Sequence, residues 1–151
     1  MLGLSKKMVF ALEAVLDIAY NAGAERVRSK EITGRQGIPQ RYIEQVMQRL
    51  VRAGILKGVR GPRGGYRLAR ERRRVTVGEI ARIVYALEDR QDPGARENGS
   101  ALGRTVVGPL WRELQDEQMA RLDAITIEEL CKRAHSSGVP SALRDHLDFT
   151  I

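Results

Sequence analysis

Side chains that can form paired hydrogen bonds with nucleic-acid bases recur along residues 40–49. A glutamine amide can donate and accept at once, as recognition of adenine requires, and an arginine guanidinium can form two bonds with guanine. A glutamate can accept a bond from the amino group of cytosine. Apolar residues at helical spacing predict a helix over about residues 39–53, with the polar side chains on its outer face. This face predicts contact with base edges or, alternatively, a hydrated helix surface, and it consists of Gln40, Arg41, Glu44, Gln45, Gln48 and Arg49.

A basic, glycine-rich segment follows that helix at residues 54–68. Two short apolar runs flank a turn, which is typical of a β-hairpin with a long loop. Arg60, Arg63 and Arg67 give the hairpin positive charge, and glycines such as Gly64 let its backbone approach another surface closely. A helix followed by a basic hairpin indicates a winged helix-turn-helix. In that arrangement the helix enters the DNA major groove, and Arg60 and Arg63 are candidates for a narrow minor groove.

Further polar side chains stand at the starts of the expected helices. Lys6, Ser29 and Lys30 lie at helix N-termini, where free backbone amides and the helix dipole favour phosphate groups. Pro39 suits the first position of the helix over 39–53. Tyr42 allows two interpretations, a phosphate contact or packing against the protein. These positions extend the expected DNA surface beyond the base-reading face.

Periodic apolar residues predict the elements that hold this surface in place. Helices are expected from Ser5 to about residue 20 and over residues 29–36, before the helix over 39–53 and the hairpin. Thr76 and Glu79 form a capping box for a fourth helix that ends near residue 87.

The second half of the chain is expected to be helical as well. A polar loop over 88–103 precedes a long helix over about 105–124, and Thr126 caps a last helix that ends near residue 134. We therefore expect a mainly α fold with a small β-hairpin wing. Its predicted parts are a winged helix-turn-helix DNA-binding domain (1–75), a helical dimerisation and sensing region (76–134) and a C-terminal tail (135–151).

The long helix carries an apolar stripe that includes the single tryptophan of the chain. This stripe either packs back on its own domain or joins two copies of the protein. Because a helix-turn-helix usually binds DNA as a two-fold dimer, we expect a homodimer formed through this helix. The predicted dimer residues are Val107, Leu110, Trp111, Leu114 and Leu122.

Charge is unevenly distributed along the 151 residues, whose net charge is +7. Residues 1–74 contain 17 lysines and arginines against 6 acidic residues, whereas residues 75–151 contain 9 against 13. This asymmetry indicates a polyanion-binding module joined to a non-binding region. Because no apolar run has membrane-spanning length and no apolar signal segment follows the first lysines, we expect a cytoplasmic protein. The sequence contains no recognisable nucleophile–base pair, metal-ligand spacing or phosphate-binding loop, so an enzyme is not expected.

Four sequence blocks resemble the Rrf-two (Rrf2) family of bacterial winged-helix transcription regulators, the family of IscR and NsrR. They are YIEQ at 42–45, VRGP with GGYRL at 59–68, LWREL at 110–114 and ITIEEL at 125–130. The likeness covers about residues 1–131. It implies a winged-helix dimer, joined by the long helix, that acts on promoters. It also implies base contacts by Glu44 and Gln45 and a wing contact by Arg60.

The sequence departs from the cluster-binding members of that family, which carry three cysteines in the loop before the long helix. Residues 88–103 contain none. Iron–sulfur clusters need thiolate or occasional histidine ligands, and Cys131 with His135 and His146 is a poor set. We therefore expect no metal and no cofactor. Cys131 is either a small buried core residue or a thiol that senses oxidation.

These features together predict a sequence-specific, DNA-binding transcriptional repressor that acts as a homodimer on a palindromic operator. Its signal stays open between a small metabolite, a protein partner and oxidation of Cys131. An effector bound at the loop over 88–103, or at its junction with the long helix, would shift the two wings relative to each other. The alternatives are a winged helix whose third helix binds another protein, and a cluster- or thiol-based redox sensor that uses Cys131.

Overall fold

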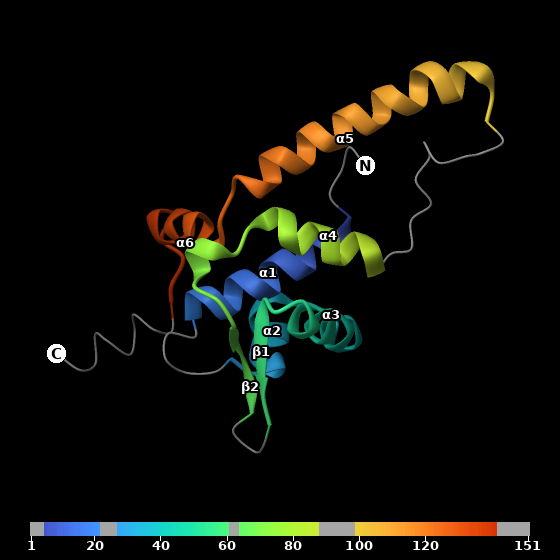
Figure 1. Cartoon of the computed structure of the whole chain (residues 1–151). Helices are drawn as coiled ribbons and strands as arrows, with labels where there is room; N and C mark the ends of the chain where they lie inside the picture. Colours follow the sequence, from blue (N-terminus) through green and yellow to red (C-terminus); the bar gives the residue numbers. More distant parts are fainter. Residues whose placement is uncertain (1–4, 22–26, 61–63, 88–98, 142–151) are drawn as a thin grey trace.

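The computed structural model describes residues 5–21, 27–60, 64–87 and 99–141. Within them the chain is mainly helical with one antiparallel hairpin, so the predicted fold class is confirmed (Figure 1). The elements in chain order are α1 (Lys6–Asn21), α2 (Ser29–Gln36), α3 (Gln40–Arg52), β1 (Leu56–Val59), β2 (Gly65–Leu68), the 3₁₀-helix η1 (Arg72–Arg74), α4 (Val77–Leu87), the π-helix η3 (Gly103–Val107), α5 (Gly108–Asp123) and α6 (Ile127–Ser136).

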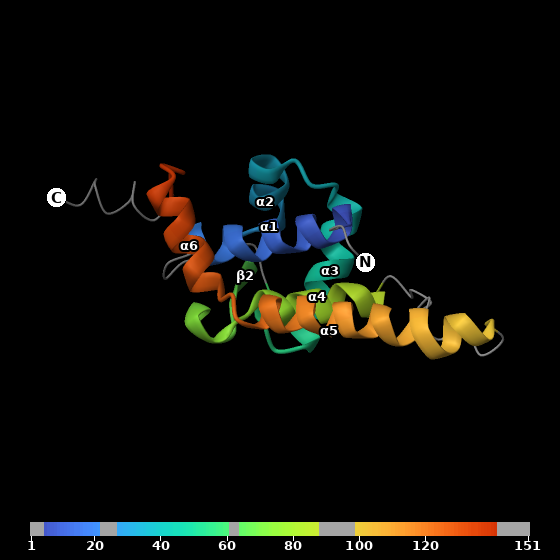
Figure 2. The same cartoon turned by 90° about the horizontal axis from the view of Figure 1, so that it is seen from above.

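Helix α1 lies at the centre of the fold, because α2, α3, α4, α6 and β2 all contact it. Its buried residues Met8, Ala11, Val15 and Ile18 follow one another at three- and four-residue spacing, which places them on one face of the helix. In the view from above, α1 crosses between α2 on one side and α4 with α5 on the other, and α3 extends from α1 toward α4 (Figure 2). The helix-turn-helix is therefore built on the same core as the second half of the chain.

The turn between α2 and α3 fixes the angle of the helix-turn-helix. Gly37 adopts φ 65°, a left-handed conformation that glycine tolerates, and its amide donates to the Thr33 carbonyl at 2.9 Å. Ile38 is buried, which anchors the turn in the core. Pro39 is the residue before α3 rather than its first helical residue, one position from the prediction.

The wing is a hairpin whose register pairs Leu56 with Leu68 and Val59 with Gly65. A third segment, which the sequence did not indicate, supports it: the amide and carbonyl of Val27 bond the carbonyl and amide of Tyr66 at 2.9 and 2.7 Å. The segment just before α2 is therefore hydrogen-bonded to strand β2 of the wing.

The second half of the chain confirms the predicted helix starts at two threonines. Thr76 Oγ1 accepts from the Glu79 amide at 3.2 Å, and Thr126 Oγ1 accepts from the Glu129 amide at 3.1 Å. Residues 88–98 of the predicted loop lie outside the described residues, and helical turns begin at residue 101, inside the expected loop. A π-helix precedes α5, which no sequence pattern predicted.

The described end of the chain returns to α1. The Tyr20 hydroxyl donates to the Val139 carbonyl at 2.6 Å, and the Ser141 hydroxyl donates to the Tyr20 carbonyl at 2.8 Å. The chain is thus attached to α1 as far as residue 141, although no apolar periodicity is present beyond residue 134. Within the described helices, none is long and apolar enough to cross a membrane.

Candidate nucleic-acid interface

Helix α3 separates its side chains into a buried and an exposed face. Ile43, Val46, Met47 and Leu50 are buried against the core. The six predicted base-reading side chains are all exposed on the same helix. The structure therefore brings together Gln40, Arg41, Glu44, Gln45, Gln48 and Arg49 as one polar surface, as predicted.

Gln40 connects this surface to the start of α2. Its amide nitrogen lies 3.4 Å from Ser29 Oγ and 3.4 Å from Glu44 Oε1, within donating distance of both oxygens. Ser29 at the first position of α2 is half-buried, and Lys30 beside it is exposed. Two positions that the sequence predicts to contact DNA, Ser29 and Gln40, are thereby held next to each other.

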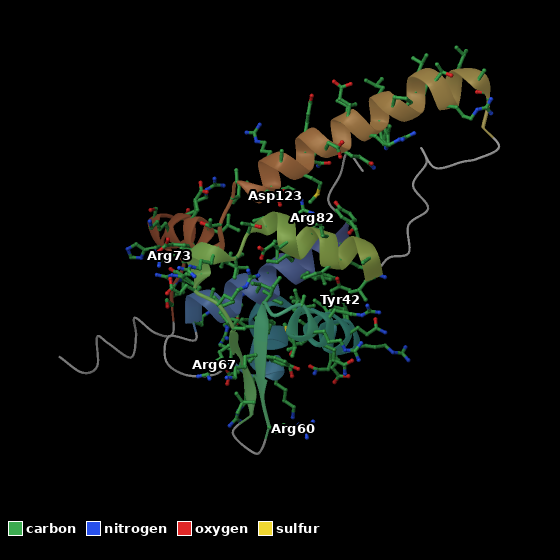
Figure 3. All side chains as sticks on the ribbon, viewed as in Figure 1. Tyr42, Arg60, Arg67, Arg73, Arg82 and Asp123 are labelled. Atoms are coloured by element: carbon green, nitrogen blue, oxygen red, sulfur yellow. The ribbon has the colours of Figure 1, made fainter. Side chains whose placement is uncertain are left out.

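Tyr42 takes part in packing inside the protein. Its hydroxyl donates to the Lys7 carbonyl at 2.6 Å, and its ring lies 5.7 Å from the Phe10 ring at a tilted angle. Figure 3 shows Tyr42 on α3, away from Arg60 on the wing. This is the second of the two interpretations of Tyr42, and the contact ties the start of α1, with exposed Lys6, to α3.

A hollow of about 610 Å³ lies between α2, the end of α3 and the wing. Its rim carries three basic side chains, Arg28, Lys30 and Arg60, and glycine backbone at Gly64 forms part of its wall. Arg63 lies outside the described residues. Sequence reasoning missed Arg28, although its position directly before Ser29 at a helix start was a usable signal. A groove lined by cations and backbone amides has the chemistry that a phosphate backbone requires.

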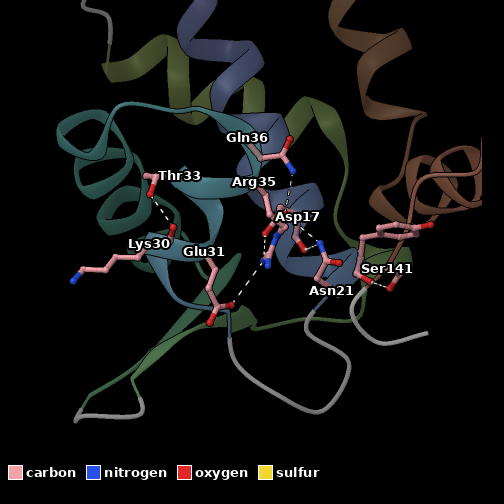
Figure 4. Close-up of polar contacts among 9 residues, drawn as sticks. Asp17, Asn21, Lys30, Glu31, Thr33, Arg35, Gln36 and Ser141 are labelled. Carbon is pink, nitrogen blue, oxygen red and sulfur yellow. Dashed lines mark hydrogen bonds and ion pairs between the residues drawn. The ribbon is translucent and has the colours of Figure 1, made fainter. Parts of the chain in front are cut away.

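A buried carboxylate holds α2 against α1. Asp17 is only 3% exposed, and its two oxygens accept from Arg35 Nε and Nη2 at 2.7 Å each (Figure 4). The side-chain amides of Asn21 and Gln36 donate to the same carboxylate at 3.1 Å. The hydrogen bond to Asp17 raises the pKa of Arg35, which stays charged. Asp17 was not among the predicted functional residues, although an acidic residue within an apolar helical stripe is a recognisable sign of a buried pair.

The start of α5 presents apolar side chains to the solvent. Leu110 is 51% exposed and Leu114 40% exposed, and Val107 in the preceding π-helix is also exposed. Trp111 and Leu122 are half-buried. The indole Nε1 of Trp111 is buried and has no hydrogen-bond partner among the described residues. Three of the five predicted dimer residues therefore lie on an unpacked surface, Trp111 is half-buried, and Leu122 packs partly against the protein's own core.

A family model described as an iron-dependent transcriptional regulator, Rrf2, matches residues 4–133. The chain belongs to the Rrf2 family. It is 36% identical to the HTH-type transcriptional regulator IscR of Escherichia coli O9:H4 (strain HS), over 98% of each chain. It is 35% identical to the IscR of Xenorhabdus nematophila, over 85% of this chain and 79% of that one.

Solved structures of Rrf2 regulators agree with this fold. The IscR of T. potens matches with a TM-score of 0.71 and 32% identity, over 92% of this chain and 93% of that one. CymR, the global cysteine regulator of B. subtilis, matches with a TM-score of 0.68 and 28% identity, over 88% of this chain and 98% of that one. The chain is therefore an Rrf2-type transcriptional regulator, a DNA-binding class of protein and not an enzyme.

The iron dependence in the family's description needs ligands that the described part of this chain does not supply. Across those residues, His, Cys, Asp and Glu side chains form no group of three or more that could hold a metal. Cys131 is only 3% exposed in α6, and burial raises the pKa of its thiol despite the opposing effect of Arg72. A protonated, buried thiol is not the thiolate that an iron–sulfur cluster needs. The described residues of this chain therefore do not fit an iron–sulfur cluster.

Proposed function

We propose that this Rrf2 protein is a cytoplasmic repressor that binds a palindromic operator as a homodimer and works without an iron–sulfur cluster. The observation that carries the proposal is the joint exposure of the polar face of α3 and the basic hollow beside the wing. The two surfaces are adjacent, and the elements that form them share one core.

The proposed docking on DNA follows from this geometry. Helix α3 lies in the major groove, where Glu44, Gln45 and Arg41 meet base edges. Arg60 on the wing enters the neighbouring minor groove. Phosphates on either side are held by Lys6, by Ser29 and by the cations that line the hollow.

The proposed dimer uses the exposed start of α5. Leucines left 40–51% exposed on one helix are stabilised when a second apolar face covers them. A second copy supplies that face under two-fold symmetry, because each protomer offers the same patch.

Repression is proposed because a dimer that covers an operator within a promoter excludes the polymerase. The burial of Cys131 disfavours the alternative redox sensor, since a sensing thiol is accessible and ionised. The effector is a small molecule or a protein partner.

One sample of anaerobically purified protein tests the proposal by its absorbance, its iron and sulfide content, its mass in solution and its genome-wide footprint. The expected result is a colourless, metal-free dimer that footprints palindromes within promoters. Brown protein with iron and sulfide would contradict cluster independence, and a monomer would contradict the dimer. A protein without any footprint would favour a winged helix that binds another protein.

A further inference from the structure

The start of α4 and the end of α5 approach each other too closely for any side chain at residue 78. A Cβ atom on Gly78 would lie 1.9 Å from Asp123 Oδ1 and 3.0 Å from Asp123 Cα. Two backbone bonds close the same junction: the Val77 amide donates to the Ile125 carbonyl, and the Ile127 amide donates to the Val75 carbonyl, each at 2.9 Å. The two chain segments are therefore joined directly at backbone level.

An ion pair one turn further along α4 also links α4 to the end of α5. Arg82 Nη1 and Nη2 donate to Asp123 Oδ1 and Oδ2 at 2.7 Å each, a paired geometry across 41 residues of sequence. Figure 3 shows the two side chains meeting between α4 and α5. Two parallel bonds constrain the relative orientation of two groups as well as their distance.

The rest of α5 is only partly buried, and Met119 and Leu122 near its end are its contacts with the core cluster. Gly108 is the single buried residue of Gly108–Asp123, and the helix runs along α4 and then beyond it (Figures 1 and 2). At 1.5 Å per residue, its sixteen residues span about 24 Å. A tilt of about 8° at the Asp123 end therefore displaces the other end by about 3.4 Å, which is one base-pair step of DNA.

We propose that Arg82 and Asp123, seated on Gly78, are positioning residues that set the angle of α5 and thereby the half-site spacing that the dimer accepts. The inference rests on the proposed function, because it requires a dimer formed through α5. The ion pair is suited to this task since both partners are partly exposed, 55% and 39%. Such a pair contributes little to stability, so its removal leaves the fold intact and changes mainly the angle.

The test uses full-length protein and the palindrome that the wild type selects from random DNA. That operator is rebuilt with its half-sites one and two base pairs closer together and farther apart. A duplex with a single half-site measures the DNA affinity of one helix-turn-helix and its wing. Arg82→Ala removes one side of the pair, and Asp123→Asn removes its charge with the same shape against Gly78. Arg121→Ala is the matched control, because this exposed arginine two residues from Asp123 makes no side-chain hydrogen bond or ion pair with a described residue.

We expect both pair variants to reduce the preference for the best spacing by about two- to fivefold, the range that an exposed ion pair can supply. The affinity of both pair variants for the single half-site should match that of the wild type. The spacing preference of Arg121→Ala should also match that of the wild type. Unchanged spacing preference in Arg82→Ala would overturn the inference, as would an equal loss of affinity for the single half-site. A wild type that is monomeric, or indifferent to spacing, would instead overturn the proposed dimer.

Discussion

At the scale of single residues, Asp17 and Arg35 are the pair on which the position of α2 depends. The side chain of Asp17 is fully buried, whereas that of Arg35 is 35% exposed. Removing one partner of a buried pair costs about 3–5 kcal/mol when the remaining charge stays away from water. That condition holds for the carboxylate and only partly for the guanidinium, which can turn to solvent.

We therefore predict that Arg35→Ala lowers the free energy of unfolding by about 3–5 kcal/mol, and that Asp17→Ala lowers it by less, about 2–3 kcal/mol. Denaturant unfolding of each variant measures the difference. Glu31→Ala is the control, since Glu31 is exposed and its oxygen lies 3.9 Å from Arg35, so its loss should cost under about 1 kcal/mol. The reverse order of the two costs would show that Arg35 and not Asp17 is the trapped charge.

The same pair shows what a sequence can and cannot predict about single residues. The caps at Thr76 and Thr126 and the left-handed Gly37 were predictable, because each depends on neighbours within four residues. Asp17 finds Arg35 eighteen residues away, and Gly78 is required by a contact with Asp123. Neither partner can be identified until the fold has placed it.

At the scale of elements, the proposed function gives α3 and the wing separate tasks in DNA recognition. Glu44 lies on the exposed face of α3, where a carboxylate can accept from a base. Arg60 lies on the wing (Figure 3), where in the proposed complex it recognises the charge and width of the groove rather than a pattern of hydrogen-bonding groups. Substitutions in the two elements should therefore change different properties of binding.

We predict that Glu44→Ala alters base preference at one operator position by about 1–3 kcal/mol, with a smaller change in overall affinity. Arg60→Ala should weaken binding to the operator and leave the base preference at that position unchanged. Binding to a panel of single-base operator variants measures both properties, with Lys132→Ala on the exposed surface of α6 as a control. Wild-type behaviour of both variants would mean that the reading face lies elsewhere.

The arrangement of these elements was largely predictable because the helices are amphipathic and the hairpin is bounded by glycines. Two features were not. The pairing of Val27 with Tyr66 joins a single residue to a distant strand, and such a short bridge has no periodicity. The π-helix before α5 depends on backbone bonding that side-chain spacing does not encode.

At the scale of the whole molecule, the positive charge of residues 1–74 should govern how strongly salt affects DNA binding. Four cations of each protomer, Lys6, Arg28, Lys30 and Arg60, lie on the proposed DNA side or border its hollow. A dimer that neutralises about eight phosphates releases counterions with a slope of log K against log salt of about −7. The acidic second half should contribute nothing to this slope.

We accordingly predict that Lys30→Ala makes the slope about two units shallower for the dimer, one for each protomer, and weakens binding alike on operator and random DNA. Lys132→Ala serves as the control, because this exposed lysine of α6 lies in the acidic half of the chain. Titrations from low to physiological salt measure the slopes of the three proteins. A slope near zero in the wild type would exclude phosphate neutralisation, and the polar face of α3 would then be better explained as a surface for another protein. A steep slope that Lys30→Ala leaves unchanged would keep the DNA function but move the phosphate contacts away from the start of α2.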